Sequence, residues 1–418
     1  MTQTAAPTLW RHPDFLRFWA SRVVTIVGSS VTSVALPVLV YHLTGSAAQT
    51  SAMFAVSTVS MVVFGLGGGV IGDRFDRRRI MVAADLVSAA AIASLVFAHL
   101  GDRLTLPHLY AAAFASASAA VVFDGSSVGA MPLLVGRARL PEANARVWGS
   151  QALLDVLVPA LVGLALAIWS PATLLIVDVL SFLGSALLVR GIRSALSHPR
   201  DGAPTTKAGL RTDLVEGMTY LRRHQTLWPL MLVAVFGAGS SAAILGLIVP
   251  WADRVLRVGT SGWRFGLIFG GFSAGAFVAS LIMPRVSRRF GAIRMTQVLL
   301  PVAALLVLVL SRIESYWPAL AVYVMASTVH ILQFSAIVTY RMQIIPEHLL
   351  SRVGTMSRVV SWGGGATLGV LIAGQVATRW GVPAAITGAG VTLTIASALA
   401  WVPALRRAAP TARYAESE

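Results

Sequence analysis

The clearest pattern along the chain is a succession of apolar segments separated by short polar stretches. A helix needs roughly 20 mostly apolar residues to cross the hydrocarbon core of a bilayer. Six such segments are predicted in the first half of the chain, at 16–41, 50–72, 80–100, 106–124, 149–168 and 172–190. Six more are predicted in the second half, at 227–250, 264–284, 295–311, 316–339, 357–378 and 383–403. The pattern therefore predicts an all-α membrane protein with twelve transmembrane helices.

One long polar stretch divides these segments into two sets of six. We expect it to form a cytoplasmic linker that ends in an amphipathic helix on the membrane surface. The N-terminus has no apolar signal core followed by a small-residue cleavage site, so the first apolar segment is expected to stay in the mature protein. The predicted domains are an N-terminal half at 1–190, the linker at 191–226, a C-terminal half at 227–404 and a cytoplasmic tail at 405–418.

Two short phrases recur between the halves at nearly the same spacing. Residues 11–13 (Arg-His-Pro) precede the first span and residues 223–225 (Arg-His-Gln) precede the seventh. Residues 140–142 (Leu-Pro-Glu) follow the fourth span and residues 345–347 (Ile-Pro-Glu) follow the tenth. Short phrases also match by chance, but two matches at nearly the same spacing favour an internal duplication. Repeats of this kind place a substrate site between the halves, near the bilayer midplane.

Composition supports the membrane interpretation. The 418 residues are 56% hydrophobic and only 12% charged, with a mean hydropathy of +0.75, whereas a soluble domain has about a quarter of its residues charged. The chain has no cysteine, which excludes disulfides and thiolate metal sites.

The net charge of +16 needs a separate explanation, because a strongly basic chain can bind nucleic acid. If the N-terminus is cytoplasmic, 27 of the 33 basic residues fall in predicted cytoplasmic segments. This bias places both termini inside a bacterial cytoplasmic membrane. The basic surface is then expected to face anionic lipid headgroups, not nucleic acid.

The end of the second span combines small residues with charges. Glycines at 65, 69 and 72 allow another helix to approach closely, as small residues do in lipid. A carboxylate at position 73 is unfavourable at the C-terminus of its own helix, so it is expected to serve the N-terminus of a neighbouring helix. The arginines that follow need acidic or phosphate partners.

This segment resembles the loop 2–3 signature of the major facilitator superfamily, Gly-x-x-x-Asp-Arg-x-Gly-Arg-Arg. Asp76 replaces the usual second glycine. Phrases at 37–46 and 176–183 are most similar to the branch that includes the enterobactin exporter and macrolide efflux proteins. The resemblance covers essentially the whole chain and implies two pseudo-symmetric six-helix halves. The matching positions are Gly69, Asp73, Arg74, Arg77 and Arg78.

In that family the loop is a cytoplasmic latch, which implies roles for these residues here. Asp73 is expected to face the N-terminus of the eleventh span, around 355–358. Arg77 is expected to pair with an acid in the fourth span, where Asp124 is the candidate. The latch holds the halves together when the transporter faces outward and breaks when it faces inward. The second copy, at 283–291, has arginines but no acid and is expected to be degenerate.

Ionisable groups inside a bilayer are costly, so each is a functional candidate. Asp85 and Arg358 lie near the inner surface and are expected to be structural, and Asp124 has the alternative of taking part in proton movement. The candidates for coupling or substrate binding are Arg22, Ser29, Asp155, Asp178, His330 and Gln333.

Asp155 precedes Pro159 in the fifth span. Drug:proton antiporters carry Gly-x-x-x-Gly-Pro-x-x-Gly-Gly there, and only Pro159 and Gly163 match. Asp155 either binds a proton or a cationic substrate, or forms a hydrogen bond between helices. His330 and Gln333 lie one turn apart in an apolar span. An imidazole exchanges protons near neutral pH, but a lone buried histidine is also commonly only hydrogen-bonded.

The other candidates also have two interpretations. Arg22 lies near the cytoplasmic end of the first span, from which an arginine can extend to the interface. Asp178 either contributes to coupling or fixes packing near the outer end of the sixth span. The hydroxyls at 25, 29, 32 and 33 form a stripe that suits a polar cavity wall, although hydroxyls also bond to their own helix.

These features predict a secondary active transporter, a proton-coupled exporter of an amphiphilic small molecule such as a drug, siderophore or secondary metabolite. An importer or facilitator on the same fold is the alternative. A membrane-embedded enzyme is a remote one, because the eight histidines form no dense catalytic cluster. An ATP-driven pump would need a phosphate-binding loop, which the sequence lacks. The expected partners are the substrate, protons and lipids, with no nucleic acid, metal or cofactor, and the expected state is a monomer.

Overall fold

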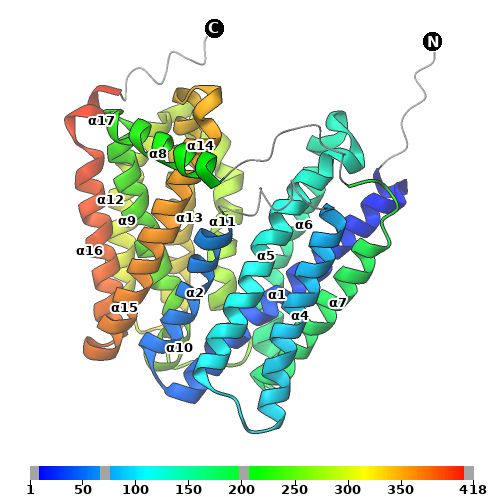
Figure 1. Ribbon diagram of the computed structural model, residues 1–418. Coiled ribbons are helices and arrows are strands. Elements are labelled where there is room, and N and C mark those ends of the chain that lie inside the picture. Colours follow the sequence, from blue (N-terminus) through cyan, green and yellow to red (C-terminus); the bar gives the residue numbers. More distant parts are fainter. Residues whose placement is uncertain (1–8, 66–75, 197–206, 409–418) are drawn as a thin grey trace, which may run out of the picture. The chain divides into compact units, whose positions relative to one another are not determined.

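The computed structural model describes residues 9–65, 76–196 and 207–408 (Figure 1). Every regular element in these ranges is a helix. Twelve of the described helices are long and apolar enough to cross a membrane. The predicted fold class and the number of spans are therefore confirmed.

The first six spans are single helices. A short 3₁₀ turn, η1 (Leu9–Arg11), precedes them, and a second, η2 (Arg137–Arg139), joins the fourth to the fifth. The spans are α1 (Pro13–Thr44), α2 (Ala47–Gly65), α4 (Arg77–Leu100), α5 (Leu106–Val135), α6 (Leu140–Ala165) and α7 (Pro171–Arg190).

The later spans are less uniform. The predicted seventh span is divided into two helices, and the eleventh contains a π-helical stretch, η3 (Val359–Ala366). The helices are α8 (Lys207–Arg223), α9 (Leu227–Gly246), α10 (Ile248–Arg254), α11 (Trp263–Phe290), α12 (Ala292–Leu310), α13 (Tyr316–Ile344), α14 (Glu347–Arg358), α15 (Thr367–Trp380), α16 (Val382–Ala400) and α17 (Pro403–Ala408).

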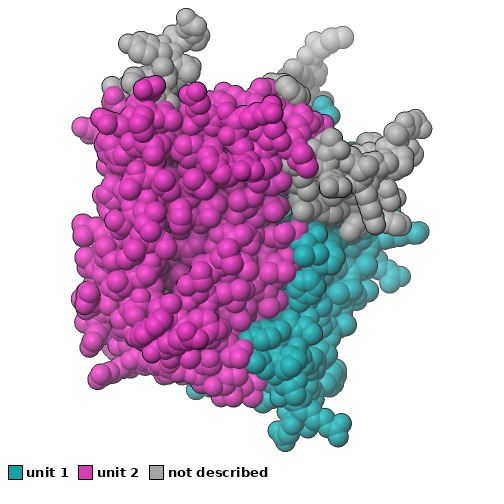
Figure 2. Space-filling view, turned by 60° about the vertical axis from the view of Figure 1, so that its left-hand side comes forward, with its two compact units in different colours: residues 1–39, 63–204 teal, residues 40–62, 205–418 magenta. Residues whose placement is uncertain are grey.

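The chain divides into two compact units (Figure 2). Unit 1 comprises residues 1–39 and 63–204, and unit 2 comprises residues 40–62 and 205–418. The last part of α1 and most of α2 thus belong with the second unit. The domain boundaries expected from the sequence followed chain order and had no means of making this assignment.

In unit 1, α4 packs along α5 and α7. An apolar cluster that includes Phe15, Phe18 and Phe123 fills one region between these helices and α1. Asp14 fixes the start of α1, because its Oδ2 accepts hydrogen bonds from the backbone N–H and the hydroxyl of Ser194 at 2.7 and 2.6 Å.

In unit 2, α9 packs against η3, α15 and α16, while α12 packs against α13 and α16. The contact of α9 with η3 and α15 depends on glycines. A Cβ at Gly365 would lie 2.5 Å from the carbonyl oxygen of Val235, and a Cβ at Gly369 would overlap the backbone of Gly239. Small residues let helices approach closely in lipid. This crossing therefore requires glycine at both positions.

Helix α8 lies across the helix ends of unit 2, beside α14 (Figure 1). Leu221, Leu349 and Val353 are buried in their shared apolar cluster. Gly217 allows the close approach, since a Cβ there would lie 2.9 Å from the carbonyl oxygen of Arg352. Glu216 forms an ion pair with the Arg352 side chain. The expected surface helix is thus docked on unit 2 by its apolar face.

The repeated Arg-His phrases have the same structural role in both halves. Nδ1 of His12 accepts a hydrogen bond from the backbone N–H of Phe15 at the start of α1. Nδ1 of His224 accepts from Thr226 and Leu227 at the start of α9, at 3.2 and 3.3 Å. Burial lowers the pKa of His224, which favours the neutral ring that can accept these bonds.

Large apolar side chains are exposed on the spans, as a lipid environment requires. Phe97, Val128 and Leu187 are 72%, 69% and 69% exposed. In water this surface would be unfavourable, whereas in a bilayer it faces acyl chains.

Candidate functional site

Unit 1 contains an ion pair between two of the candidate residues. Arg22 of α1 donates to Oδ1 of Asp124 of α5 at 2.5 Å. The Arg22 side chain is 16% exposed and that of Asp124 is 61% exposed. The guanidinium also lies 5.5 Å from the ring centroid of Phe123. Arg22 is therefore held inward by a carboxylate that itself remains accessible.

The latch residues are only partly described. Gly69, Asp73 and Arg74 lie outside the described residues, so their expected contacts stay predictions. Arg77 donates to the backbone carbonyls of Gly129 and Leu196, and Arg78 donates to that of Ser194 at 2.6 Å.

Asp124, the expected partner of Arg77, forms its ion pair with Arg22. This pairing could not be predicted from spacing, because the two residues lie 102 positions apart in the chain. Arg77 and Arg78 thereby fix the start of α4 to α5 and to the segment that follows α7. The Arg77–Asp124 contact stays a prediction.

Asp178 of α7 is fully buried and lies against α1. Thr32 donates a short hydrogen bond to Oδ2, and Ser181 donates to Oδ1 at 3.1 Å. Gly28 makes room for this group, because a side chain there would overlap both Ser181 and the carboxylate. The geometry supports the packing interpretation of Asp178.

Asp85 of α4 is as deeply buried, with 2% of its surface exposed. Among the described residues, its Oδ2 has no hydrogen-bond partner. Ser185 of α7 lies near it, fully buried and also without a partner of normal geometry. A buried charge without a partner costs several kcal/mol, on the order of the loss of one side of a buried ion pair. From its position near a helix end, Asp85 was expected to be structural. That position alone does not reveal that the carboxylate is buried or that it lacks a partner.

The remaining candidates in unit 1 are less constrained. Asp155 of α6 is partly buried and interacts with Gln151, one turn earlier in the same helix. In the hydroxyl stripe of α1, Thr32 binds Asp178 and Ser33 donates to the carbonyl of Ser30. Ser29 is half-buried. The stripe is thus divided between tertiary contacts and bonds to its own helix.

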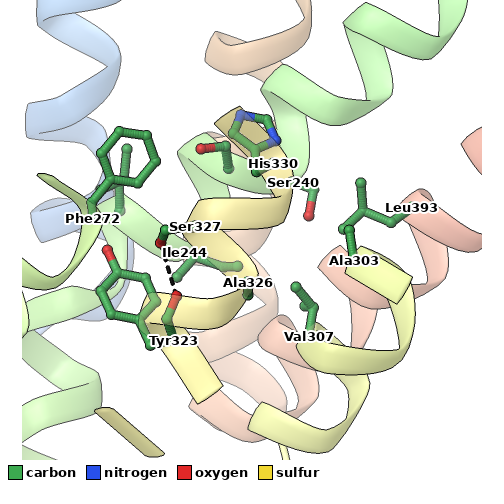
Figure 3. A pocket seen from close by; sticks show the side chains of 12 residues that line it. Ser240, Ile244, Phe272, Ala303, Val307, Tyr323, Ala326, Ser327, His330 and Leu393 are labelled. Carbon is green, nitrogen blue, oxygen red and sulfur yellow. Dashed lines mark hydrogen bonds between the residues drawn. The ribbon is translucent and has the colours of Figure 1, made fainter. Parts of the chain in front are cut away.

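His330 lines a small cavity of about 30 Å³ inside unit 2 (Figure 3). The cavity also contains the hydroxyls of Ser240 and Tyr323, each buried and without a hydrogen-bond partner among the described residues. Its volume suits one or two water molecules, which unpaired hydroxyls favour. Gln333, one turn on, is buried, and both it and His330 approach Gly237 of α9. The cavity is too small for a drug-sized ligand.

Sequence reasoning missed a polar network at the other end of α1. The hydroxyl of Tyr41 donates to Asp253 at 2.7 Å and accepts from Nε of Arg254 at 2.9 Å. Arg254 also donates to the carbonyl of Gly45. The phrase at 37–46 was the available signal, since it contains both Tyr41 and Gly45.

Helix α2 is fixed to the same unit by small polar residues. Ser51 donates to the carbonyl of Gly246 at 3.1 Å, and Thr58 and Thr367 share a hydrogen bond of 2.6 Å. The backbone N–H of Ala48 donates to Thr378 at 3.1 Å. Together with the Tyr41 network, these bonds hold the α1–α2 connection against α9, α10 and α15.

The comparisons with known proteins agree with this architecture. A family model described as a transmembrane secretion effector, within the major facilitator superfamily, matches residues 2–417. The chain belongs to this family. These transmembrane secretion effectors and the related structures are transporters, so the expectation that the chain is not an enzyme is confirmed.

Two curated relatives and one solved structure illustrate the similarity. The multidrug efflux pump Tap of Mycobacterium tuberculosis is 26% identical over 424 aligned residues, covering 95% of this chain and 94% of that protein. Macrolide efflux protein A of Streptococcus pyogenes is 27% identical over 220 residues, covering 52% of this chain and 54% of that protein, about half its length. A bacterial homologue of the human lysosomal transporter Spinster, solved inward-facing and unoccupied, has a TM-score of 0.78 at 15% identity, with 98% of this chain and 99% of that one covered.

The similarity confirms the predicted major facilitator fold and the resemblance to macrolide efflux proteins. The chain is a multi-pass integral membrane transporter of this family.

Proposed function

We propose that the chain is a secondary active exporter of amphiphilic small molecules such as drugs, siderophores or secondary metabolites. It works by alternating access in the bacterial cytoplasmic membrane, with both termini inside, as a monomer without cofactor or nucleic-acid partner. The observation that carries the proposal is the similarity to a multidrug efflux pump along 95% of the chain.

Proton coupling is the second part of the proposal. Its support is the set of embedded ionisable groups in unit 1, where Arg22 pairs with Asp124 and lies near Asp85, which is buried. Such groups are rare in spans and are costly unless they serve binding or transport. The latch around Asp73 belongs to the same proposal, as the element that biases the two conformations.

Export is tested by expressing the chain in a macrolide-sensitive bacterium and following the accumulation of a radiolabelled macrolide and of a lipophilic cationic dye. The expected result is lower accumulation of at least one compound, reversed when a protonophore collapses the proton gradient. The control is the Asp73→Asn variant at equal membrane abundance, which should restore accumulation. Higher accumulation of the compounds in cells with the native chain would instead favour an importer.

A further inference from the structure

Four ionisable residues embedded in the spans of unit 1, namely Arg22, Asp85, Asp124 and Asp178, are unequally provided with partners. Asp178 binds two hydroxyls, those of Thr32 and Ser181. Asp124 binds the guanidinium of Arg22 and is exposed over 61% of its side chain. Asp85 is buried, and its Oδ2 has no hydrogen-bond partner among the described residues. Of the three acids, Asp85 is therefore the one with the least compensation for its burial, since Ser185 is a hydrogen-bonding neighbour but Oδ2 has no partner among the described residues.

The cation within reach of Asp85 is already engaged. Arg22 is close enough to Asp85 for electrostatic attraction, but its Nη1 lies 2.5 Å from the carboxylate of Asp124. Asp178 adds repulsion if both acids are ionised. A carboxylate in these surroundings is unfavourable, and the neutral acid is the form that suits an unpaired buried position.

We propose that Asp85 is a proton-binding site of unit 1 and that Arg22 sets its occupancy by pairing alternately with Asp124 and Asp85. With Arg22 on Asp124, as in this structure, Asp85 holds its proton. When Arg22 moves to Asp85, the O–H bond of the acid breaks and the proton passes to water, while the guanidinium neutralises the carboxylate that remains. Asp124, already exposed, is then stabilised by hydration.

The geometry makes Arg22 suited to this exchange. Its side chain is only 16% exposed, so a move between the two acids takes place away from bulk screening. In the part of the chain that the structure describes, the charged groups that act on Asp85 are Arg22 from α1 and Asp178 from α7, and Asp124 from α5 pairs with Arg22. Among neutral groups, Ser185 and Ser88 lie nearby, and Ser88 donates to the carbonyl of Ser116 of α5.

Protonation is measured directly by infrared difference spectroscopy on the full chain in lipid nanodiscs, with isotope-labelled aspartate to assign the carboxylic acid band. The wild-type protein should show a protonated aspartate band at neutral pH that is lost in Asp85→Asn. Asp102→Asn is the matched control, because Asp102 lies in an exposed loop with φ 51°, which asparagine tolerates. This variant should keep the band.

The Arg22 exchange gives two shifts of opposite sign in protein that retains Asp85. Arg22→Gln removes the shared cation and should raise the pH midpoint of the band by about one unit, a ten-fold change in proton affinity. Asp124→Asn frees Arg22 for Asp85 and should lower the midpoint by a similar amount. These two variants keep the proposal testable if Asp85→Asn fails to fold.

Two results would overturn the proposal. One is a band that persists in Asp85→Asn and disappears only in Asp178→Asn, and the other is a midpoint that neither Arg22→Gln nor Asp124→Asn moves. The proposal rests on the proposed function only in linking this proton to transport. If the spectra are as expected but transport does not respond to a pH gradient, proton coupling is refuted and the proton-binding site at Asp85 stands. If transport is driven by protons but the protonated Asp85 band is absent, the proton-binding site is refuted and the proposed export function stands.

Discussion

Replacing Tyr41 with phenylalanine removes one hydroxyl from the network that ties the α1–α2 connection to the end of α10. The hydroxyl donates to Asp253 at 2.7 Å and accepts from Arg254 at 2.9 Å. The aromatic ring, which lies 5.5 Å from the Arg254 guanidinium, is retained in the variant. The substitution therefore deletes two hydrogen bonds and preserves the apolar packing.

The magnitude follows from the exposure of the partners. Tyr41 is 8% exposed, whereas Asp253 is partly buried and Arg254 is exposed, so water compensates in part for the lost bonds. A hydrogen bond to a charged group contributes about 1.5–3 kcal/mol, and the lower end applies to partners that water reaches. We expect a loss of about 1.5 kcal/mol for the pair, which is roughly a ten-fold increase in the local opening constant.

Hydrogen–deuterium exchange of the amides in residues 45–51 measures this opening in the protein reconstituted in lipid. The control is Thr260→Val, which removes the exposed bond of 2.8 Å between His42 and Thr260 and should change the exchange by no more than about two-fold. Exchange in Tyr41→Phe equal to that of the control would show that the network does not hold the connection closed.

Four further outcomes are expected. Asp73→Asn should slow transport without removing the protein from the membrane, and wild-type transport by this variant would refute the latch. Asp178→Ala should lower the free energy of unfolding by about 2 kcal/mol, because the hydroxyls of Thr32 and Ser181 lose the carboxylate that accepts from them; thermal unfolding in detergent, with Asp102→Asn as control, measures it. Asp155→Asn should leave gradient-driven transport intact if Asp85 carries the proton. Loss of gradient-driven transport in this variant would instead assign the coupling to Asp155 in α6. Acidification should protonate Nδ1 of His224, whose pKa is lowered, and remove the hydrogen bonds that cap α9. Hydrogen exchange of the first amides of α9 should therefore rise below about pH 6.5 and not above it.

The sequence predicted the spans well because the hydrocarbon core imposes a minimum apolar length on every crossing helix. The repeated Arg-His phrases correspond to a shared structural role, since His12 and His224 cap the first helix of each half. The π-helical stretch in the eleventh span was not predictable from hydropathy. Its glycines reported a close approach, but their partner, Gly239, lies more than a hundred residues away.

The sequence identified the residues of the candidate site, but it did not show which of them pair with one another. Arg22, Asp124 and Asp178 stood out as ionisable residues in apolar segments. Which acid binds Arg22 depends on tertiary packing, and a charge near a helix end gives no measure of burial. For that reason Asp85, which the sequence assigned to structure, has become the residue of most interest, while Asp155 has gained no partner from another helix among the described contacts.

The most direct test of the account is transport by the purified chain in proteoliposomes with an imposed pH gradient. A macrolide or lipophilic cation, present at equal concentration on both sides, should accumulate in the acidic lumen of vesicles in which the cytoplasmic face is outside. It should fail to accumulate when the gradient is reversed or collapsed by an ionophore, and liposomes with the Asp73→Asn variant should accumulate it more slowly. Equal movement under both signs of the gradient, above that of empty liposomes, would contradict proton-driven export and indicate a facilitator.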